Sequence, residues 1–145
     1  MRIALASDHA GYKLKQELLS YLSNFEVVDF GTDSPQSTDY PDIGFAAAEA
    51  VAKGECNRGI LICGSGIGMS IVANKVNGIR AALCTSETIA RPSRQHNDSN
   101  ILVLPGRFIS FDEAKKIVDT WITTKFDGGR HQRRLNKIKK YEERR

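Results

Sequence analysis

The chain has 145 residues, 41% of them hydrophobic and 26% charged, which is the composition of a globular domain with a real core. No apolar run approaches the roughly 20 residues that span a bilayer and none resembles a signal peptide, so a cytoplasmic protein is predicted. Residues 125–145 hold nine Lys or Arg against three acidic residues, a local balance of +6 within a net charge of +4, so an anionic partner is expected near this tail.

Short apolar runs alternate with segments of helical periodicity along the whole chain. The pattern predicts strands at 3–7, 25–30, 60–62, 79–84 and 100–104, helices at 12–23, 43–53, 86–95 and 110–124, and a short helix that ends near 76. Segment 32–42 is predicted to be a loop, and Pro92 is expected to interrupt its helix. We expect Gly54 to end the second helix, and Ser110 with Glu113 to form a capping box.

Strands that alternate with helices form a parallel sheet covered on both faces. The predicted fold is therefore a single α/β domain over 1–145, a three-layer Rossmann-like sandwich with a five-stranded parallel sheet. After Gly128-Gly129, a last helix carries only a thin apolar stripe of Leu135, Ile138 and Tyr141. Such a stripe buries little within one chain, so we expect this helix to extend to a partner subunit.

One stretch, from Arg58 to Ser70, joins a strand to a glycine-rich turn that directly precedes a helix. Its apolar run 60–62 has no polar alternation, as expected of a strand covered on both faces. Cys63 then lies at the carboxyl end of the strand, where open α/β sheets bind their ligands. A thiol, free backbone N–H groups and a helix dipole are thus predicted to meet there, which favours a thiolate and suits a phosphate or a developing oxyanion.

Familiar nucleotide and phosphate motifs are absent from this turn. A dinucleotide fingerprint that starts at Gly64 requires glycine at position 69, and a Walker A loop requires a Gly-Lys pair where Met69-Ser70 stand. A Cys-x5-Arg phosphatase loop that starts at Cys63 requires arginine, again in place of Met69. The turn is therefore not a nucleotide site of these kinds.

The three cysteines, Cys56, Cys63 and Cys84, lack C-x-x-C spacing. Their odd number and spacing predict neither a disulfide framework nor a zinc site, so free thiols are expected. Cys63 is open to two interpretations at this point. It is either a reactive thiol beside free N–H groups, or a buried residue that ends a strand before a tight turn.

Two further polar clusters could act on a ligand. His96 and Asn97 precede the fifth strand, and an imidazole can act as acid or base near neutral pH while an amide can donate to an oxygen. Arg130 and Arg134 are four residues apart, so on a helix they share a face and can grip one phosphate. From spacing alone, a surface histidine in a polar loop and a solvated basic face explain these residues as well or better.

Five segments follow one another along nearly the whole chain: Ser7-Asp8-His9-Ala10-Gly11, Thr38-Asp39-Tyr40-Pro41, Cys63-Gly64-Ser65-Gly66-Ile67-Gly68, Arg94-Gln95-His96-Asn97-Asp98 and Gly128-Gly129-Arg130-His131. Together they resemble the type B ribose-5-phosphate isomerases, a family that includes galactose- and allose-6-phosphate isomerases. The resemblance implies an aldose–ketose isomerase without metal or other cofactor, which interconverts ribose 5-phosphate and ribulose 5-phosphate through an enediolate. It also implies a homodimer, or a homotetramer, in which the partner subunit supplies part of the site.

The resemblance further implies a role for each matching residue. Cys63 corresponds to the base that moves the proton between C2 and C1, and His96 to the acid that opens the sugar ring. Ser65 stands where some members carry a threonine that assists proton transfer, and the hydroxyl is retained. The implied ligands of the sugar hydroxyls and the enediolate oxygens are Asp8, Asn97 and the backbone of Gly64, Ser65, Gly66, Ile67 and Gly68. The implied phosphate ligands are His9, Arg107, Arg130 and Arg134.

Two alternatives remain open from the sequence. One is an isomerase of the same fold that acts on a six-carbon sugar phosphate, because the sequence does not fix the carbon number. A phosphate-binding or nucleic-acid-binding module would use the basic tail instead. Beyond Phe126 the tail holds a single aromatic residue, Tyr141, which leaves little for bases to stack on, so neither nucleic acid nor membrane is an expected partner.

Overall fold

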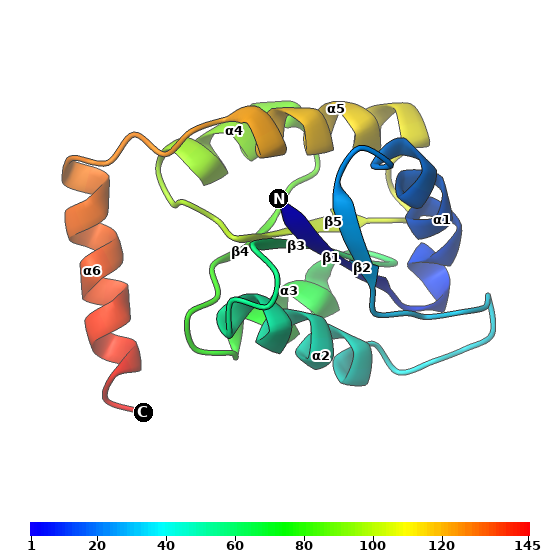
Figure 1. The fold of residues 1–145 in the computed structure, drawn as a ribbon, viewed down its shortest axis with the longest axis horizontal. Coiled ribbons are helices and arrows are strands. Elements are labelled where there is room, and N and C mark those ends of the chain that lie inside the picture. Colours follow the sequence, from blue (N-terminus) through cyan, green and yellow to red (C-terminus); the bar gives the residue numbers. More distant parts are fainter.

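The computed structural model describes residues 1–145, with a five-stranded parallel sheet between two helical layers (Figure 1). The strand order is β2-β1-β3-β5-β4, and every neighbouring pair is parallel. The elements are β1 (Arg2–Ser7), η1 (His9–Gly11), α1 (Tyr12–Tyr21), β2 (Glu26–Asp29), α2 (Tyr40–Ala52), β3 (Arg58–Cys63), α3 (Ile67–Asn74), β4 (Ala81–Leu83), α4 (Glu87–Gln95), β5 (Ile101–Pro105), α5 (Phe111–Thr123) and α6 (Arg130–Glu142). The predicted fold class is confirmed. None of the helices combines the length and the apolar character needed to cross a bilayer.

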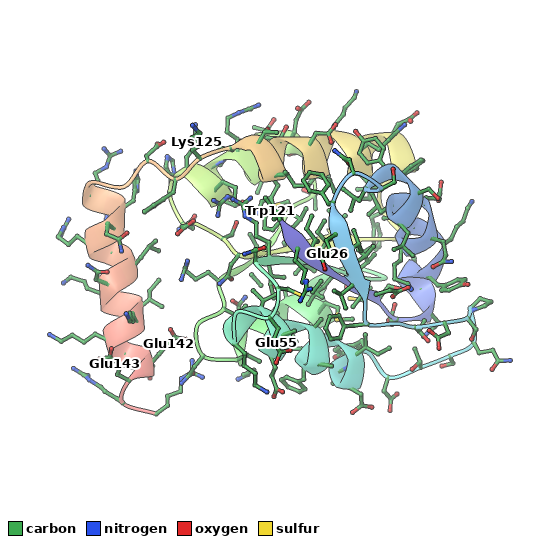
Figure 2. All side chains as sticks on the ribbon, in the orientation of Figure 1. Glu26, Glu55, Trp121, Lys125, Glu142 and Glu143 are labelled. Carbon is green, nitrogen blue, oxygen red and sulfur yellow. The ribbon has the colours of Figure 1, made fainter.

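Each face of the sheet builds its own core, because successive side chains of a strand point to opposite faces. In β1, Ile3 and Leu5 face α1, α4 and α5, whereas Ala4 and Ala6 face α2 and α3. Trp121 of α5 is fully buried in the first core, and its Nε1 donates to Ser99 Oγ at 2.8 Å. Figure 2 shows Trp121 beneath α5, among the side chains that fill this layer.

Two predictions about helix boundaries are wrong. The segment 32–42 is not a loop to its end, since α2 begins at Tyr40 after the N-cap residue Asp39. Pro41 fits there because the first turn of a helix has no partner for its N–H group. Pro92 does not interrupt α4, which continues from Glu87 to Gln95. A proline removes one helix hydrogen bond, and packing against α5 outweighs that loss here.

The predicted helix ends at Gly54 and Ser110 are confirmed. Gly54 follows the last turn of α2 with a φ of +79°, the left-handed conformation that commonly ends a helix. Ser110 Oγ accepts from the N–H of Glu113 at 3.1 Å, and the Glu113 carboxylate accepts from the Ser110 N–H, which completes the capping box.

The last helix, α6, stands beside the rest of the chain, at the left of Figure 1. The connection enters it through Gly128 and Gly129, both with positive φ, +70° and +57°. Its apolar stripe is divided: Leu135 is 7% exposed within this one chain, while Ile138 and Tyr141 are 49% and 65% exposed. The expectation of burial on a partner therefore applies to the last two residues and stays a prediction.

Candidate functional site

The carboxyl ends of three central strands bring most of the predicted site residues together. Ser7 of β1 pairs with Ile62 of β3, and Cys63 pairs with Pro105 of β5, so these strands end side by side. The residues that follow them meet at this edge of the sheet, where α/β folds bind ligands. We call this group the carboxyl-edge site; it comprises Asp8, His9, Cys63, the loop Gly64–Gly68 and Arg107.

The loop Gly64–Gly68 presents backbone N–H groups that make no hydrogen bond within the chain. Four of them belong to Gly64, Ser65, Gly66 and Gly68, and the N–H of Met69, directly after the loop, also lacks a partner, whereas the N–H of Ile67 donates to Ser65 Oγ at 3.2 Å. Gly66 is the N-cap of α3 with a φ of +78°, and a Cβ there would collide with Leu83. Only glycine therefore holds this turn without strain, and the turn leaves a row of donors at the positive end of a helix.

Two side chains close against the glycines of this loop. A Cβ on Gly68 would lie 2.6 Å from Cζ of Tyr40, so the aromatic ring rests directly on the backbone. At Gly64 the nearest side-chain atom is Nη1 of Arg107, at 3.3 Å from the same hypothetical Cβ, and the Arg107 N–H donates to the Gly64 carbonyl at 3.0 Å. Arg107 thus places an exposed guanidinium beside the loop. Tyr40 was not among the predicted site residues, although it belongs to one of the five segments.

Cys63 ends β3 directly before the loop and is 4% exposed. It packs on the face of the sheet that carries α2 and α3, in one core cluster with Met69. The three cysteines are free, as predicted. Burial raises the pKa of the Cys84 thiol to about 11 and also raises the pKa of Cys56, so both stay protonated at neutral pH.

Asp8 and His9 are held by backbone donors from two different segments. Asp8 Oδ1 accepts from the N–H groups of Ala10 and Gly11, at 3.0 and 3.1 Å, and Oδ2 makes no hydrogen bond within the chain. His9 Nδ1 accepts from the Thr38 N–H at 3.2 Å. An imidazole that accepts at Nδ1 carries its proton on Nε2, so His9 offers an N–H donor to an anion.

The other predicted site residues lie at the opposite edge of the sheet in the same chain. His96 and Asn97 follow α4 and precede β5, and Arg130 and Arg134 are on the first turns of α6. We call these four residues the amino-edge group. From Ile101 to Pro105, β5 advances about 13 Å at roughly 3.3 Å per residue, and it separates this group from Cys63. One chain therefore does not bring the two groups together.

His131 stacks on His96, a contact that the sequence did not predict. The two rings lie 4.4 Å apart between centroids and 15° from parallel. Burial, then the nearby charges of His96, Arg130 and Arg134, lower the pKa of His131. With Asp127, the two histidines place potential metal-ligating atoms within 4.8 Å of one another. The lone pairs of nearly parallel rings do not converge on one ion, so the arrangement is a ring stack and not a built metal site.

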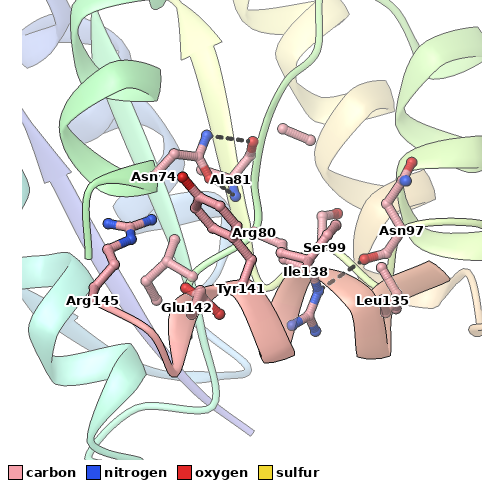
Figure 3. Close-up of a pocket in the computed structure, with 12 residues that line it drawn as sticks. Asn74, Arg80, Ala81, Asn97, Ser99, Leu135, Ile138, Tyr141, Glu142 and Arg145 are labelled. Atoms are coloured by element: carbon pink, nitrogen blue, oxygen red, sulfur yellow. Dashed lines mark hydrogen bonds between the residues drawn. The ribbon is translucent and has the colours of Figure 1, made fainter. Parts of the chain in front are cut away.

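A pocket of about 350 Å³ lies between α6 and the segment Ile79–Ala82, which leads into β4 (Figure 3). Its α6 wall includes Leu135, Ile138 and Tyr141, and its opposite wall includes Asn97. At the far end of α6, the Glu142 carboxylate accepts from the Gly78 N–H at 2.8 Å. The helix is thus held near both ends, and its exposed apolar residues line an open groove next to the amino-edge group.

Known proteins resemble this chain in both sequence and fold. Residues 3–138 match the model of the ribose/galactose isomerase family. Ribose-5-phosphate isomerase B of Escherichia coli (strain K12) is 47% identical over 146 residues, which cover 99% of this chain and 98% of that protein. The structure of Clostridium thermocellum ribose-5-phosphate isomerase B is 54% identical with a TM-score of 0.98, over 99% of both chains.

A second solved structure is that of ribose-5-phosphate isomerase B from Mycoplasma genitalium with bound ribulose-5-phosphate. It is 45% identical, with a TM-score of 0.95 over 98% of this chain and 96% of that one. These matches extend over nearly the entire sequence and confirm the resemblance carried by the five segments. The chain belongs to the ribose/galactose isomerase family.

Proposed function

We propose that this protein is an aldose–ketose isomerase that interconverts D-ribose 5-phosphate and D-ribulose 5-phosphate through an enediolate. One observation carries the proposal: Cys63 lies directly before a loop in which four of the five backbone N–H groups have no acceptor within the chain. The names of the relatives support it, since the M. genitalium protein was solved with the ketose phosphate bound. The same reaction is a proton transfer between adjacent carbons, which needs one base and donors for the charge that develops.

In the proposed mechanism, Cys63 acts as a thiolate on the open-chain sugar. It takes the proton from C2, which the neighbouring C1 carbonyl acidifies, and returns it to C1, while the proton of the C2 hydroxyl passes to the C1 oxygen. The negative charge that builds on the two oxygens meets the N–H groups of the loop Gly64–Gly68, and the Ser65 hydroxyl lies beside them. Donors of this kind typically contribute about 3 kcal/mol each to the transition state. The site therefore stabilises the enediolate more than the sugar.

The phosphate is proposed to bind away from the reacting carbons. At the carboxyl-edge site His9 offers its Nε2–H and Arg107 offers an exposed guanidinium. The guanidinium is the one cation there, whereas the phosphate carries two negative charges. Arg130 and Arg134 supply the further charge and lie one turn apart on α6. Binding energy at the phosphate then positions C1 and C2 beside Cys63.

The proposed site is built from two chains. The amino-edge group is at the far end of the sheet from Cys63, so His96 and Asn97 reach a substrate only on the carboxyl-edge site of another copy. A two-fold dimer forms two such sites at once, because each chain gives one group and receives the other. Exposed apolar side chains support this pairing: Ile67 and Ile71 of α3 are each 57% exposed, next to the loop, and α6 leaves its own groove open.

His96→Asn should impair ring opening more than isomerisation. Ribose 5-phosphate is mainly a closed ring in water, and an acid or base that moves the ring proton typically contributes about 10²- to 10⁴-fold. We therefore expect a loss of that order in kcat/KM with the cyclic substrate and a much smaller loss with an open-chain analogue. Stopped-flow assays with both compounds measure the difference. Equal losses would remove the ring-opening role of His96.

The substrate is tested by a side-by-side assay of ribose 5-phosphate, allose 6-phosphate and galactose 6-phosphate. The proposal predicts the highest kcat/KM with the five-carbon sugar. Preference for either six-carbon sugar would keep the mechanism and change the substrate, an alternative that the family description, ribose/galactose isomerase, makes specific. Absence of turnover with all three, combined with phosphate binding, would indicate a binding module instead of an enzyme.

A further inference from the structure

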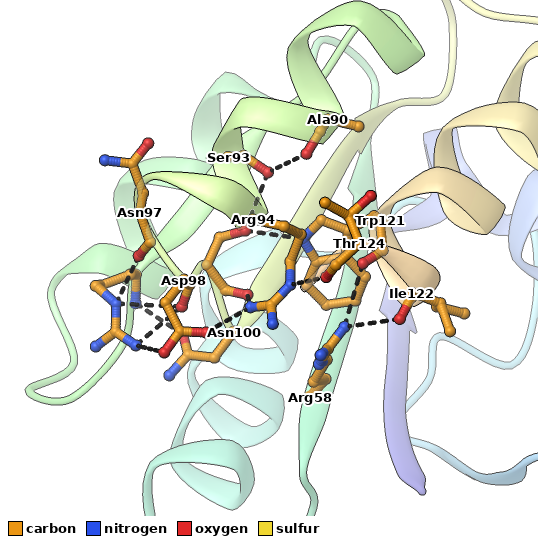
Figure 4. A network of polar contacts seen from close by, with 12 residues as sticks. Arg58, Ala90, Ser93, Arg94, Asn97, Asp98, Asn100, Trp121, Ile122 and Thr124 are labelled. Carbon is orange, nitrogen blue, oxygen red and sulfur yellow. Dashed lines mark hydrogen bonds and ion pairs between the residues drawn. The ribbon is translucent and has the colours of Figure 1, made fainter. Parts of the chain in front are cut away.

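The residue after the His96-Asn97 pair has an unusual backbone conformation. Asp98 is the one residue other than glycine with positive φ, at +45°. Aspartate tolerates this region better than most residues, because its short side chain can satisfy the local backbone. Here the carboxylate binds two arginines from different elements: Arg94 Nη1 lies 2.8 Å from Oδ1, and Arg80 Nη2 lies 3.5 Å from Oδ2 (Figure 4).

The same two guanidinium groups hold the backbone on both sides of Asp98. Arg80 Nε donates to the Asn97 carbonyl at 2.9 Å, and Arg80 Nη2 donates to the Asp98 carbonyl at 2.9 Å. Arg94 Nη1 donates to the Ser99 carbonyl at 2.7 Å. Three successive carbonyls are thus fixed by charged donors, which make stronger hydrogen bonds than neutral ones. We call Arg80, Arg94 and Asp98 the arginine clamp.

The clamp is anchored in the core of the protein. Arg94 is 5% exposed, and its Nε also donates to the Thr124 carbonyl at the end of α5, at 3.3 Å. Asp98 is the single carboxylate within ion-pair distance of either arginine. A buried cation that loses its only anionic partner is strongly disfavoured, so the carboxylate fixes where the two guanidinium groups lie.

The side chains that precede the clamp are, in contrast, not hydrogen-bonded, although the His96 ring stacks on His131. His96 and Asn97 are exposed and their side chains make no hydrogen bond within the chain. The clamp holds the backbone next to them, and their side chains are accessible to solvent. A preformed ligand-binding element requires a fixed backbone and accessible side chains, because a loosely held loop would misplace its reactive groups.

We infer that Asp98 is a positioning residue, which holds His96 through the arginine clamp in the geometry that ring opening requires. The inference rests on the proposed function, since it assumes that His96 acts on the sugar. The effect is indirect: Asp98 itself contacts only Arg80 and Arg94. Because His96 is proposed to serve the site of a second chain, a small rotation of the loop displaces its ring from that substrate.

Asp98→Asn tests this inference with little change in shape. Asparagine tolerates the same left-handed backbone and removes only the charge. We expect kcat/KM for ribose 5-phosphate to fall about 10- to 100-fold, because a displacement near 1 Å can cost that much. Inhibition by inorganic phosphate should change less than about twofold, since none of the proposed phosphate ligands makes a hydrogen bond or ion pair with the clamp. The matched control, Asp112→Asn, removes an exposed ion pair with Lys115 on α5 and should leave activity unchanged.

A double-mutant comparison separates positioning from general structural damage. If Asp98 acts through His96, Asp98→Asn should add less than about a threefold loss in a His96→Asn background. An equal loss in both backgrounds would overturn the inference. Should Asp98→Asn fail to fold, Arg80→Lys, which keeps the charge but cannot reach two carbonyls, must show the same pattern. A His96→Asn variant without any defect would instead contradict the proposed function of His96, independently of the clamp.

Discussion

Cys63→Ala is expected to lower kcat for ribose 5-phosphate by about 10²- to 10⁴-fold, the range that a positioned base contributes. The reason is chemical, because alanine has no group that can carry the proton between C2 and C1. Binding of inorganic phosphate, measured by calorimetry, should remain within about twofold of the unmodified protein, since His9 and Arg107 keep their places. Steady-state kinetics and calorimetry on one preparation give both numbers.

A matched control exists within the same chain. Cys84→Ala removes a thiol that is 0% exposed in the other core, on the opposite face of the sheet from Cys63, and should cost stability without a comparable loss of kcat. The measurement is the thermal unfolding midpoint beside the kinetic constants. Near-normal turnover of Cys63→Ala would rule out its role as base, and an equal loss of kcat in Cys84→Ala would show that any core defect suffices.

Two inactive variants should restore activity when they share a dimer. In a mixture of Cys63→Ala and His96→Asn chains, each mixed dimer has one site with both defects and one site with neither. Random pairing of equal amounts makes half of the dimers mixed, so about a quarter of the original specific activity should return. Co-expression with two different affinity tags allows the mixed species to be isolated and assayed.

The control for this experiment pairs two variants of the same group. Cys63→Ala mixed with Cys63→Ser leaves every site with a defective carboxyl edge, so no activity should return. If the first mixture also stays inactive although mixed dimers form, His96 and Cys63 do not meet between two chains. The proposal of a shared site would then fail, while the isomerase activity itself would remain to be explained by a different acid.

The fold could be predicted because local patterns decide it. Strands such as 60–62 are apolar throughout, and a capping box at Ser110 announces the start of a helix. The errors arose where tertiary packing overrides a local rule. Pro92 should end a helix, yet α4 continues because its buried face is held against α5. The start of α2 at Tyr40 was missed because the preceding polar residues read equally well as loop.

The candidate site could be predicted only in part. Residues that follow β1, β3 and β5 share one edge by the rule for parallel sheets, and the structure places Asp8, Cys63 and Arg107 there. The same rule assigns His96 to the other edge, since it precedes β5. Contacts between segments distant in the chain could not be predicted, such as the ring of Tyr40 on Gly68. They depend on the relative placement of elements, which no local pattern encodes.

The direction of α6 is set by a very short piece of backbone. Gly129 combines a φ of +57° with a ψ of −129°, which side-chain-bearing residues avoid, although no atom lies within 4 Å of the place a methyl group would take. Space is thus ample and the restriction is purely torsional. A methyl group at position 129 would therefore change the direction of the thirteen-residue helix α6. It would displace the guanidinium groups of this helix without changing any of their side chains. The placement of the proposed phosphate ligands on α6 therefore depends on a residue that has no side chain.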